Sequence, residues 1–254
     1  MVIKLTEKEE KARSMLCLPL DNLKNSMEIQ DRIIEQKDYV ELFKIGKGTF
    51  TRCGLQSLIL SRNYNVEAFL DLKYFDIPNT VMDAAEAATE HEVNMFNVHA
   101  LGGLEMMKAA VEGVRKASEE YGKRKPKILG VTILTSIDQK IMNEQLRIPG
   151  TVQDQVLHLA RLSHEAGLDG IVCSAADLYA VKDKLPENFM YVTPEIQGTK
   201  TPAGADQKRV FSPGNAIKAG SSILVVGRAI TSPKTSEERQ QAAYEILQDM
   251  AQYL

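Results

Sequence analysis

Eight short runs of apolar residues recur along the chain and constrain its fold more than any other feature of the sequence. They are rich in Val, Ile, Leu and Met, and within each run the apolar residues follow one another instead of alternating with polar ones. This pattern is typical of parallel strands that are buried on both faces of a sheet. The runs cover residues 15–20, 40–45, 66–70, 94–98, 127–134, 170–173, 190–192 and 222–226.

Stretches with helical spacing separate the runs, and the last of them begins with the capping-box pattern of Thr235 and Glu238. Eight strands at a mean spacing of about 30 residues, each followed by a helix, predict an α/β fold of the (β/α)8 barrel type. A length of 254 residues fits a barrel that is a single domain, 1–254. The alternative is an open doubly wound sheet. Its glycine-rich turn after the first strand is missing, because residues 22–25 read Asn-Leu-Lys-Asn.

The composition argues against several other classes of protein. Lys and Arg number 31 against 34 Asp and Glu, so the chain lacks the basic excess of a typical nucleic-acid binder. Its longest stretch without a charged residue, 93–104, is shorter than the roughly 18 residues of a membrane span. Cys17, Cys53 and Cys173 are too few and too scattered for a disulfide framework or a zinc site. We therefore expect a soluble, cytoplasmic enzyme without a metal.

Two segments do not fit the predicted alternation of strands and helices. The first is a short N-terminal extension, 1–13, which precedes the first run. The second is the segment 195–211, which has no hydrophobic period and is crowded with Gly, Pro, Lys and Arg. A loop of this length in a compact domain is usually an active-site lid or a binding loop, and is otherwise disordered.

Charged residues at the ends of the second and third runs form the most informative pattern. Asp71 and Lys73 are two residues apart, so on a strand they point to the same side. Lys44 closes the second run, and Asp76 falls in the turn after the third. One interpretation is an ordinary salt bridge beside a capped helix. However, stability does not require two lysines and two carboxylates at adjacent strand ends, and such clusters favour a functional interpretation.

Catalytic groups of barrels lie at the C-terminal ends of the strands, so polar residues at other strand ends are further candidates. Asp21 follows the first run and is either a helix cap or a site residue. Thr135 and Ser136 end the fifth run, where they suit the amide-like edge of a heterocycle or simply end the strand. Gly227 and Arg228 end the eighth run, where they form either a phosphate site or a tight turn with a solvated arginine.

Residues 69–80, Phe-Leu-Asp-Leu-Lys-Tyr-Phe-Asp-Ile-Pro-Asn-Thr, resemble the signature of the orotidine 5′-phosphate decarboxylase family. The segments 44–46, 134–136, 169–175, 206–209 and 225–231 follow in that family's order, so the resemblance covers nearly the whole chain. The third-strand motif is shared with sugar-phosphate decarboxylases and synthases of the same suprafamily. Leu-Thr-Ser at 134–136 and Asp-Gln-Lys-Arg at 206–209 are similar to the orotidylate enzyme in particular.

The resemblance implies a homodimer of (β/α)8 barrels that converts orotidine 5′-monophosphate to UMP and CO2 without a cofactor, the last step of de novo UMP synthesis. It implies that Lys73 protonates C6 as CO2 leaves, within a network of Lys44, Asp71, Lys73 and Asp76. It also implies that Asp76 and Thr80 reach into the neighbouring subunit's site. The implied substrate-binding set is Asp21, Lys44, Asp71, Lys73, Asp76, Ile77, Thr80, Thr135, Ser136, Gln197, Gln207, Gly227 and Arg228.

The chain departs from the family's pattern before the predicted lid. Many bacterial members have Pro-Gly-Ile-Arg there, whereas residues 194–197 read Pro-Glu-Ile-Gln, and Gln197 can form hydrogen bonds but supplies no charge. Two alternative functions follow from the same residues. A metal-dependent sugar-phosphate decarboxylase or lyase would need a further carboxylate where Lys44 stands. A non-catalytic nucleotide-binding protein would not need the complete set of Lys and Asp residues.

Overall fold

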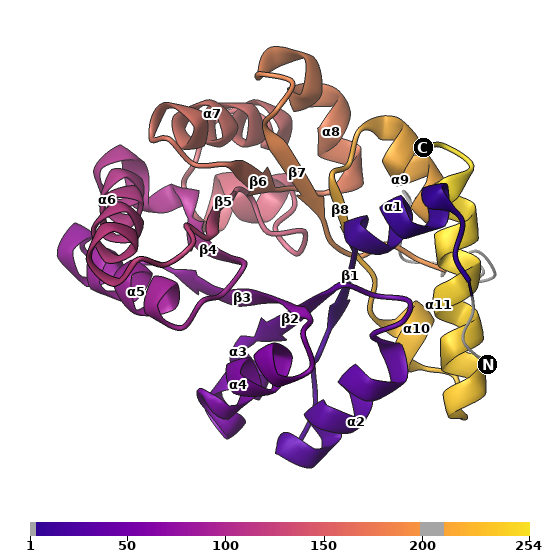
Figure 1. Cartoon of the computed structure of the whole chain (residues 1–254). Helices are drawn as coiled ribbons and strands as arrows, with labels where there is room; N and C mark the ends of the chain where they lie inside the picture. Colours follow the sequence, from indigo (N-terminus) through magenta and orange to yellow (C-terminus); the bar gives the residue numbers. More distant parts are fainter. Residues whose placement is uncertain (1–3, 199–210) are drawn as a thin grey trace. The chain divides into compact units, whose positions relative to one another are not determined.

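The computed structural model describes residues 4–198 and 211–254. Parallel strands lie at all eight predicted runs and pair in the order β1 to β8 to close a barrel, with the labels of Figure 1. The strands are β1 (Leu16–Pro19), β2 (Leu42–Gly46), β3 (Glu67–Tyr74), β4 (Met95–His99), β5 (Lys127–Val131), β6 (Gly170–Val172), β7 (Met190–Thr193) and β8 (Ile223–Val225). The predicted (β/α)8 barrel is confirmed, and the open doubly wound sheet is not what forms.

Helices follow the strands, as the sequence pattern predicts. The helices are α1 (Glu7–Met15), α2 (Ser26–Gln36), α3 (Lys47–Cys53), α4 (Gln56–Asn63), α5 (Pro78–Glu90), α6 (Gly103–Tyr121), α7 (Val152–Glu165), α8 (Ala175–Val181), α9 (Pro213–Ala219), α10 (Arg228–Thr231) and α11 (Ser236–Ala251). The described connections also contain two 3-10 turns, η1 (Ala100–Gly102) and η3 (Lys182–Lys184), and one π-helical turn, η2 (Ile141–Gln145). No helix in the described part of the chain combines the length and hydropathy that a membrane crossing requires.

The chain divides into two compact units, which are described separately. The first unit comprises Met1–Asp71 and Thr193–Leu254. In its sheet β1 pairs with both β2 and β8, since Cys17 lies opposite Leu42 on one side and Val225 on the other. Helix α1, in the N-terminal extension, lies beside α11 (Figure 1). The predicted capping box of α11 is confirmed, because the side chains of Thr235 and Glu238 each accept a hydrogen bond from the other's backbone N–H.

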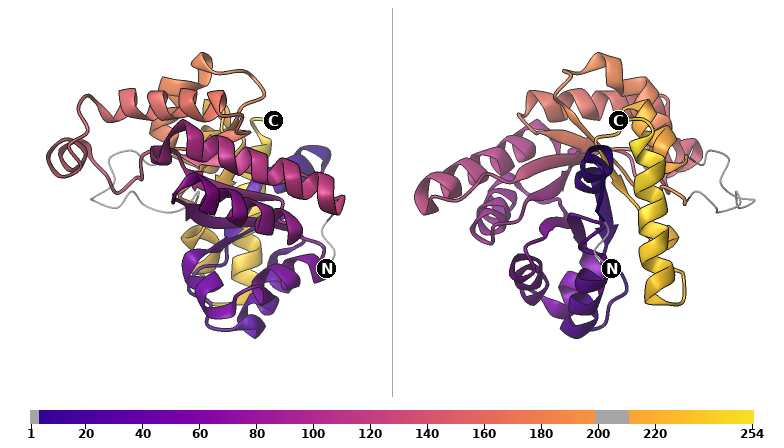
Figure 2. Two further views of the ribbon diagram at one scale, coloured as in Figure 1. Left: turned by 90° about the vertical axis from the view of Figure 1, so that its left-hand side faces the viewer. Right: turned by 45° about the vertical axis from the view of Figure 1, so that its right-hand side comes forward.

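The second unit comprises Leu72–Val192 and contains β4 to β7 in parallel register. Helices α5 and α6 lie side by side in it (Figure 2). Glycine permits this close approach, because a Cβ atom on Gly113 would lie 2.4 Å from the carbonyl oxygen of Met82. Gly170 of β6 plays the same part between strands, since its Cβ would lie 2.4 Å from the carbonyl oxygen of Met190.

We expect Gly170→Ala to lower the free energy of unfolding by about 2 kcal/mol, because backbone atoms of β7 would have to move away from the new methyl group. The matched control is Gly48→Ala in α3, where the nearest atom is the flexible guanidinium of Arg52 at 3.3 Å. That substitution should be neutral or slightly stabilising, because alanine favours a helix. Urea unfolding of both variants measures the difference. Equal stability of the two variants would contradict the close-approach argument.

Candidate active site

In the first unit, Lys44 joins two carboxylates that come from different strand ends. Its ammonium Nζ lies 3.0 Å from Oδ2 of Asp71 and 3.3 Å from Oδ1 of Asp21. The side chains of Lys44 and Asp71 are only 12% and 11% exposed, whereas that of Asp21 is half exposed. The three residues therefore form a partly buried charge cluster that opens to solvent through Asp21.

The backbone around Asp21 explains why its carboxylate reaches Lys44. A Cβ atom on Gly46 would lie 2.7 Å from Oδ1 of Asp21, so only glycine leaves room for this carboxylate. The N–H of Leu20 donates to the carbonyl oxygen of Lys44 at 2.9 Å, and the hydroxyl of Thr49 donates to the carbonyl oxygen of Leu20. These contacts hold the end of β1 against the end of β2.

The charge cluster keeps Lys44 ionised. Burial by itself would lower the pKa of the Lys44 ammonium, but the charges of Asp71 and then Asp21 outweigh burial and raise that pKa above its ordinary value. Burial also raises the pKa of the Cys17 thiol, so this neighbouring residue of β1 is neutral. Cys17 and Cys173 are both buried and therefore act as small core residues.

In the second unit, the backbone of Lys73 is strained and is held by a neighbouring strand. Lys73 has a φ of +52°, in the left-handed region that a residue with a side chain rarely adopts. Its N–H donates to Oδ1 of Asn97 at 2.8 Å, and Asn97 is buried in β4. The alternation argument for Asp71 and Lys73 assumes an extended strand, and the backbone at Lys73 does not meet that assumption. Strained residues of this kind cluster at functional sites.

Asn97 is the residue that the sequence analysis missed. It contacts the backbone of Lys73, not a substrate-facing group, so no strand-end argument selects it. The available signal is an amide in the middle of the otherwise apolar run 94–98. A buried amide requires hydrogen-bond partners, and in this chain one partner is the lysine with the most unusual backbone of the candidate set.

The segment from the end of β3 into α5 exposes three predicted substrate-binding residues, of which Asp76 and Thr80 were predicted to serve a partner subunit. Asp76, Ile77 and Thr80 are all exposed, and Oδ1 of Asp76 accepts a hydrogen bond from the N–H of Ile77 at 2.7 Å. Phe75 is 60% exposed and packs against the ring of His99 at 5.5 Å between centroids. Helix α5 begins directly after Ile77, with Pro78 in its first turn.

The remaining predicted residues lie after the C-terminal ends of their strands. Thr135 and Ser136 are the exposed central residues of a turn closed by a hydrogen bond from the N–H of Ile137 to the carbonyl oxygen of Leu134. Gly227 precedes α10, where its carbonyl oxygen accepts from the third and fourth residues that follow it, and Arg228 is exposed. Gln197 is half-buried in the segment after β7. Gln207 lies outside the described residues, as does most of the predicted lid.

The structure thus brings Asp21, Lys44 and Asp71 together in the first unit, which also carries Gln197, Gly227 and Arg228. The second unit carries Lys73, Asp76, Ile77, Thr80, Thr135 and Ser136. Within residues 4–198 and 211–254, no group of three or more His, Cys, Asp or Glu side chains is arranged to hold a metal ion. A fixed ammonium among carboxylates is suited to stabilising charge that develops on a bound anion.

A barrel with lysines and carboxylates at its strand ends belongs to the class of (β/α)8-barrel enzymes. Residues 14–245 match the family model described as "Orotidine 5'-phosphate decarboxylase / HUMPS family". With that match, and with the relatives described next, the chain belongs to this family.

Relatives and a solved structure resemble the chain over nearly its full length. The orotidine 5′-phosphate decarboxylase of Syntrophus aciditrophicus is 44% identical over 216 residues, which are 85% of this chain and 84% of that protein. The enzyme of the same name from Syntrophotalea carbinolica is 40% identical over 240 residues, 94% of this chain and 96% of that protein. The crystal structure of orotidine 5′-phosphate decarboxylase from Lactobacillus acidophilus has a TM-score of 0.79 at 31% identity, covering 94% of this chain and 99% of its own.

We expect Lys44→Met to lower the free energy of unfolding at pH 7 by about 3 kcal/mol, because it leaves the buried Asp71 beside Asp21 without the shared ammonium. The folded state raises the pKa of Lys44, so this contribution is complete below the unfolded pKa of about 10.4. It is lost as the pH rises through the folded pKa. The difference between the wild type and the variant should therefore be equal at pH 7 and pH 9 and shrink above about pH 10.5.

Urea unfolding over this pH range is the measurement, and Lys127→Met is the matched control. Lys127 forms a 2.8 Å ion pair with Asp169, but its side chain is 55% exposed. The control should therefore lose less than about 1 kcal/mol. A Lys44→Met variant that is no less stable than the control would contradict the role assigned to the cluster.

Proposed function

We propose that this protein decarboxylates orotidine 5′-monophosphate to UMP and CO2 without a cofactor, as the last step of de novo UMP synthesis. Membership of the family and the names of relatives more than 40% identical support this reaction. The observation that carries the proposal is the ammonium of Lys44 held between Asp21 and Asp71. Lys73 follows Asp71 by two residues on strand β3. These are the residue types that an anionic substrate losing a carboxylate requires.

Lys73 is the proton donor of the proposed reaction. The bond from C6 to the carboxylate carbon breaks, and its electron pair remains on C6 as CO2 leaves. The ammonium of Lys73 stabilises that developing charge and transfers a proton to C6, after which solvent reprotonates the amine. An ammonium fixed where charge develops favours the transition state over the ground state. The strained backbone of Lys73, held by Asn97, supports a preorganised position for this group.

The other residues bind and orient the nucleotide in this proposal. Asp71 lies against the substrate carboxylate, Lys44 bridges the ribose and the carboxylates, and Asp21 binds a ribose hydroxyl. The raised pKa of Lys44 supports its role as a permanent cation. Thr135 and Ser136 contact the pyrimidine, and Gln207, Gly227 and Arg228 contact the phosphate, while Gln197 is a further substrate-binding residue. Contacts remote from C6 contribute to the rate when they hold the reacting group in place and exclude water.

The proposal includes a homodimer with shared active sites, in which Asp76 and Thr80 serve the partner subunit and Ile77 is a further substrate-binding residue. The exposed Phe75 and Ile77 support an interface there, because large apolar side chains gathered on one turn are typical of a contact surface. We also propose that the chain is one barrel domain, 1–254, with the segment 195–211 as its lid. A cytoplasmic location is part of the proposal, supported by the free thiols of Cys17, Cys53 and Cys173.

A metal-dependent sugar-phosphate decarboxylase or lyase is the alternative on the same scaffold. Such an enzyme would need a further carboxylate ligand at the position of Lys44, whereas here an ammonium lies within 3.3 Å of both carboxylates. Decarboxylation of orotidine 5′-monophosphate, followed by absorbance in the presence of EDTA, separates the two functions. Full turnover with EDTA supports the proposal. A metal-dependent enzyme for sugar phosphates would give no turnover of this nucleotide, with or without EDTA.

We expect Lys73→Ala to lower kcat by about 10³-fold or more while UMP affinity changes by less than about tenfold, because Lys73 acts on the developing carbanion and not on the product. The control is Lys108→Ala, which removes an exposed lysine of α6 and should leave both quantities unchanged. Steady-state kinetics and calorimetry with UMP make the measurements. Near-normal turnover of the Lys73 variant would refute the mechanism.

We expect activity to return when two inactive variants share a dimer. Lys73→Ala and Asp76→Asn homodimers are each impaired at both sites, whereas a mixed dimer has one site with both substitutions and one wild-type site. Subunit exchange in an equimolar mixture makes about half of the dimers mixed, so about a quarter of wild-type activity should return. Activity is measured before and after co-refolding. Mixed dimers confirmed by mass without recovered activity would show that Asp76 acts within its own subunit.

A further inference from the structure

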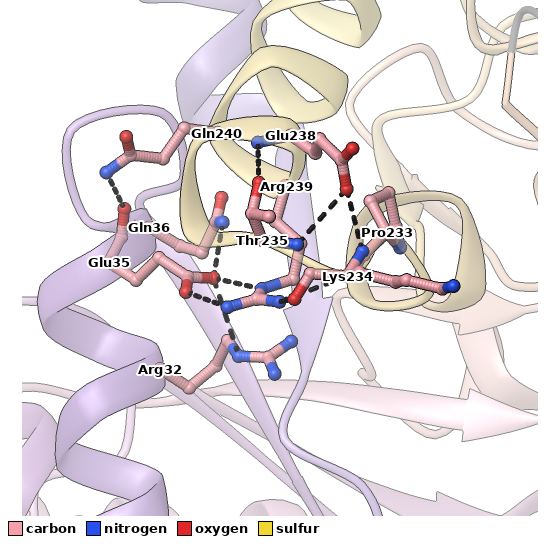
Figure 3. A network of polar contacts seen from close by, with 9 residues as sticks. All are labelled: Arg32, Glu35, Gln36, Pro233, Lys234, Thr235, Glu238, Arg239 and Gln240. Carbon is pink, nitrogen blue, oxygen red and sulfur yellow. Dashed lines mark hydrogen bonds and ion pairs between the residues drawn. The ribbon is translucent and has the colours of Figure 1, made fainter.

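A second network of charges lies in the first unit and shares no residue with the cluster of Lys44 (Figure 3). Glu35, in the last turn of α2, accepts two parallel hydrogen bonds from Arg239, in the first turn of α11. Nε of Arg239 lies 2.9 Å from Oε1 of Glu35, and Nη2 lies 2.6 Å from Oε2. The two residues are 204 positions apart, and their side chains are only 11% and 17% exposed. A bidentate pair of this kind fixes orientation as well as distance.

The same guanidinium also holds the chain that leads into α11. Nη1 of Arg239 donates to the carbonyl oxygens of Pro233 at 3.0 Å and of Lys234 at 2.8 Å (Figure 3). Gln240 adds a bond from its Nε2 to the carbonyl oxygen of Glu35 at 3.0 Å. Burial alone would raise the pKa of Glu35, but the hydrogen bonds from Arg239 and Gln36 and the charge of Arg32 lower it, so the pair stays ionised.

These contacts complete a closed cycle of elements. At one end β1 pairs with β8, the N–H of Val226 donates to the carbonyl oxygen of Cys17 at 3.0 Å, and Gly227 approaches the ring of Pro19. From β1 the chain continues through Asp21 into α2, and from β8 it continues through Gly227 into α10 and residues 233–234. At the other end, the ion pair of Glu35 and Arg239 connects α2, which follows β1, to α11, which follows β8 and α10. The loops that carry Asp21 and Arg228 therefore lie between two fixed junctions.

We propose that Arg239 and Glu35 are positioning residues that set the place of the phosphate-binding loop, Gly227 and Arg228, relative to the ribose-binding Asp21. This inference rests on the proposed function for the identity of the ligand, a nucleoside 5′-monophosphate. Helix α10 is a single turn of four residues, so an anchor at residues 233–234 lies only five and six positions beyond Arg228. A shift of that anchor moves the phosphate-binding loop.

A second bidentate pair in the chain provides a matched comparison. Arg115 binds Glu112 with Nε and Nη2 at 2.8 and 2.7 Å, but both residues lie on α6 and are exposed. Such a pair joins no separate elements and contributes little. Lysine in place of either arginine keeps the charge and removes the planar fork, so Arg239→Lys and Arg115→Lys are the same chemical change in different settings.

The experiment measures the affinities for UMP and for uridine by calorimetry, and KM and kcat for orotidine 5′-monophosphate. We expect Arg239→Lys to lower the ratio of UMP to uridine affinity about tenfold and to raise KM about tenfold, with uridine affinity and kcat within about threefold of wild type. Arg115→Lys should match the wild type. Arg228→Ala, which removes the proposed phosphate ligand itself, should lower the ratio further.

A structural role alone would lower the melting temperature without changing this ratio, so an unchanged ratio in a folded Arg239→Lys variant overturns the inference. Glu35→Gln is the second variant, and it should give the same change of ratio if Arg239→Lys does not fold. In the double variant the two effects should not add, because both remove one contact. A wild-type protein that binds UMP without decarboxylating orotidine 5′-monophosphate overturns the proposed reaction only. The affinity ratio then still decides the positioning role.

Discussion

The ion pairs of Lys44 are the interaction on which the arrangement of the first unit's strand ends depends. A largely buried ammonium is costly unless carboxylates with good geometry surround it, and Asp71 and Asp21 supply that geometry at 3.0 and 3.3 Å. The requirement extends to the backbone. Gly46 has no side chain where the carboxylate of Asp21 lies, and Thr49 holds the carbonyl oxygen of Leu20. Gly46 and Thr49 therefore both help to place a carboxylate beside the buried ammonium of Lys44.

The strands were predictable because burial on both faces leaves a signal in the sequence itself. The predicted strand ends are less accurate where residues are buried but do not pair with a neighbouring strand. The run 127–134 continues past the end of β5, since Thr132 and Ile133 are buried without belonging to the strand. Helix α1 gave no signal for the opposite reason. It is highly charged and buries only Glu9 and Ala12, so no apolar stripe marks it.

The candidate site was predictable to the extent that charges interrupt apolar runs. Lys44, Asp71 and Asp21 each follow or close such a run, and the structure brings them together. Contacts between residues distant in the sequence leave no such mark. Glu35 and Arg239 are ordinary charged residues on polar helix faces, and only the paired ends of α2 and α11 give them a role. Asn97 was missed because it supports the backbone conformation of Lys73, and a pattern of residue types does not predict individual φ angles.

The left-handed backbone at Lys73 lowers the stability of the fold, whereas the proposed reaction requires the lysine side chain at this position. Glycine adopts a φ of +52° without steric conflict, so replacing the side chain would relieve strain of about 1 kcal/mol or more. Relief of backbone strain would thus favour glycine at this position, whereas the proposed function requires the ammonium of the lysine. In a lineage that no longer needed the proposed reaction, position 73 would be one of the left-handed positions, with Glu92, Arg147 and Glu195, at which glycine relieves strain. A glycine at position 73 in an otherwise intact sequence would indicate that the protein has lost the proposed activity.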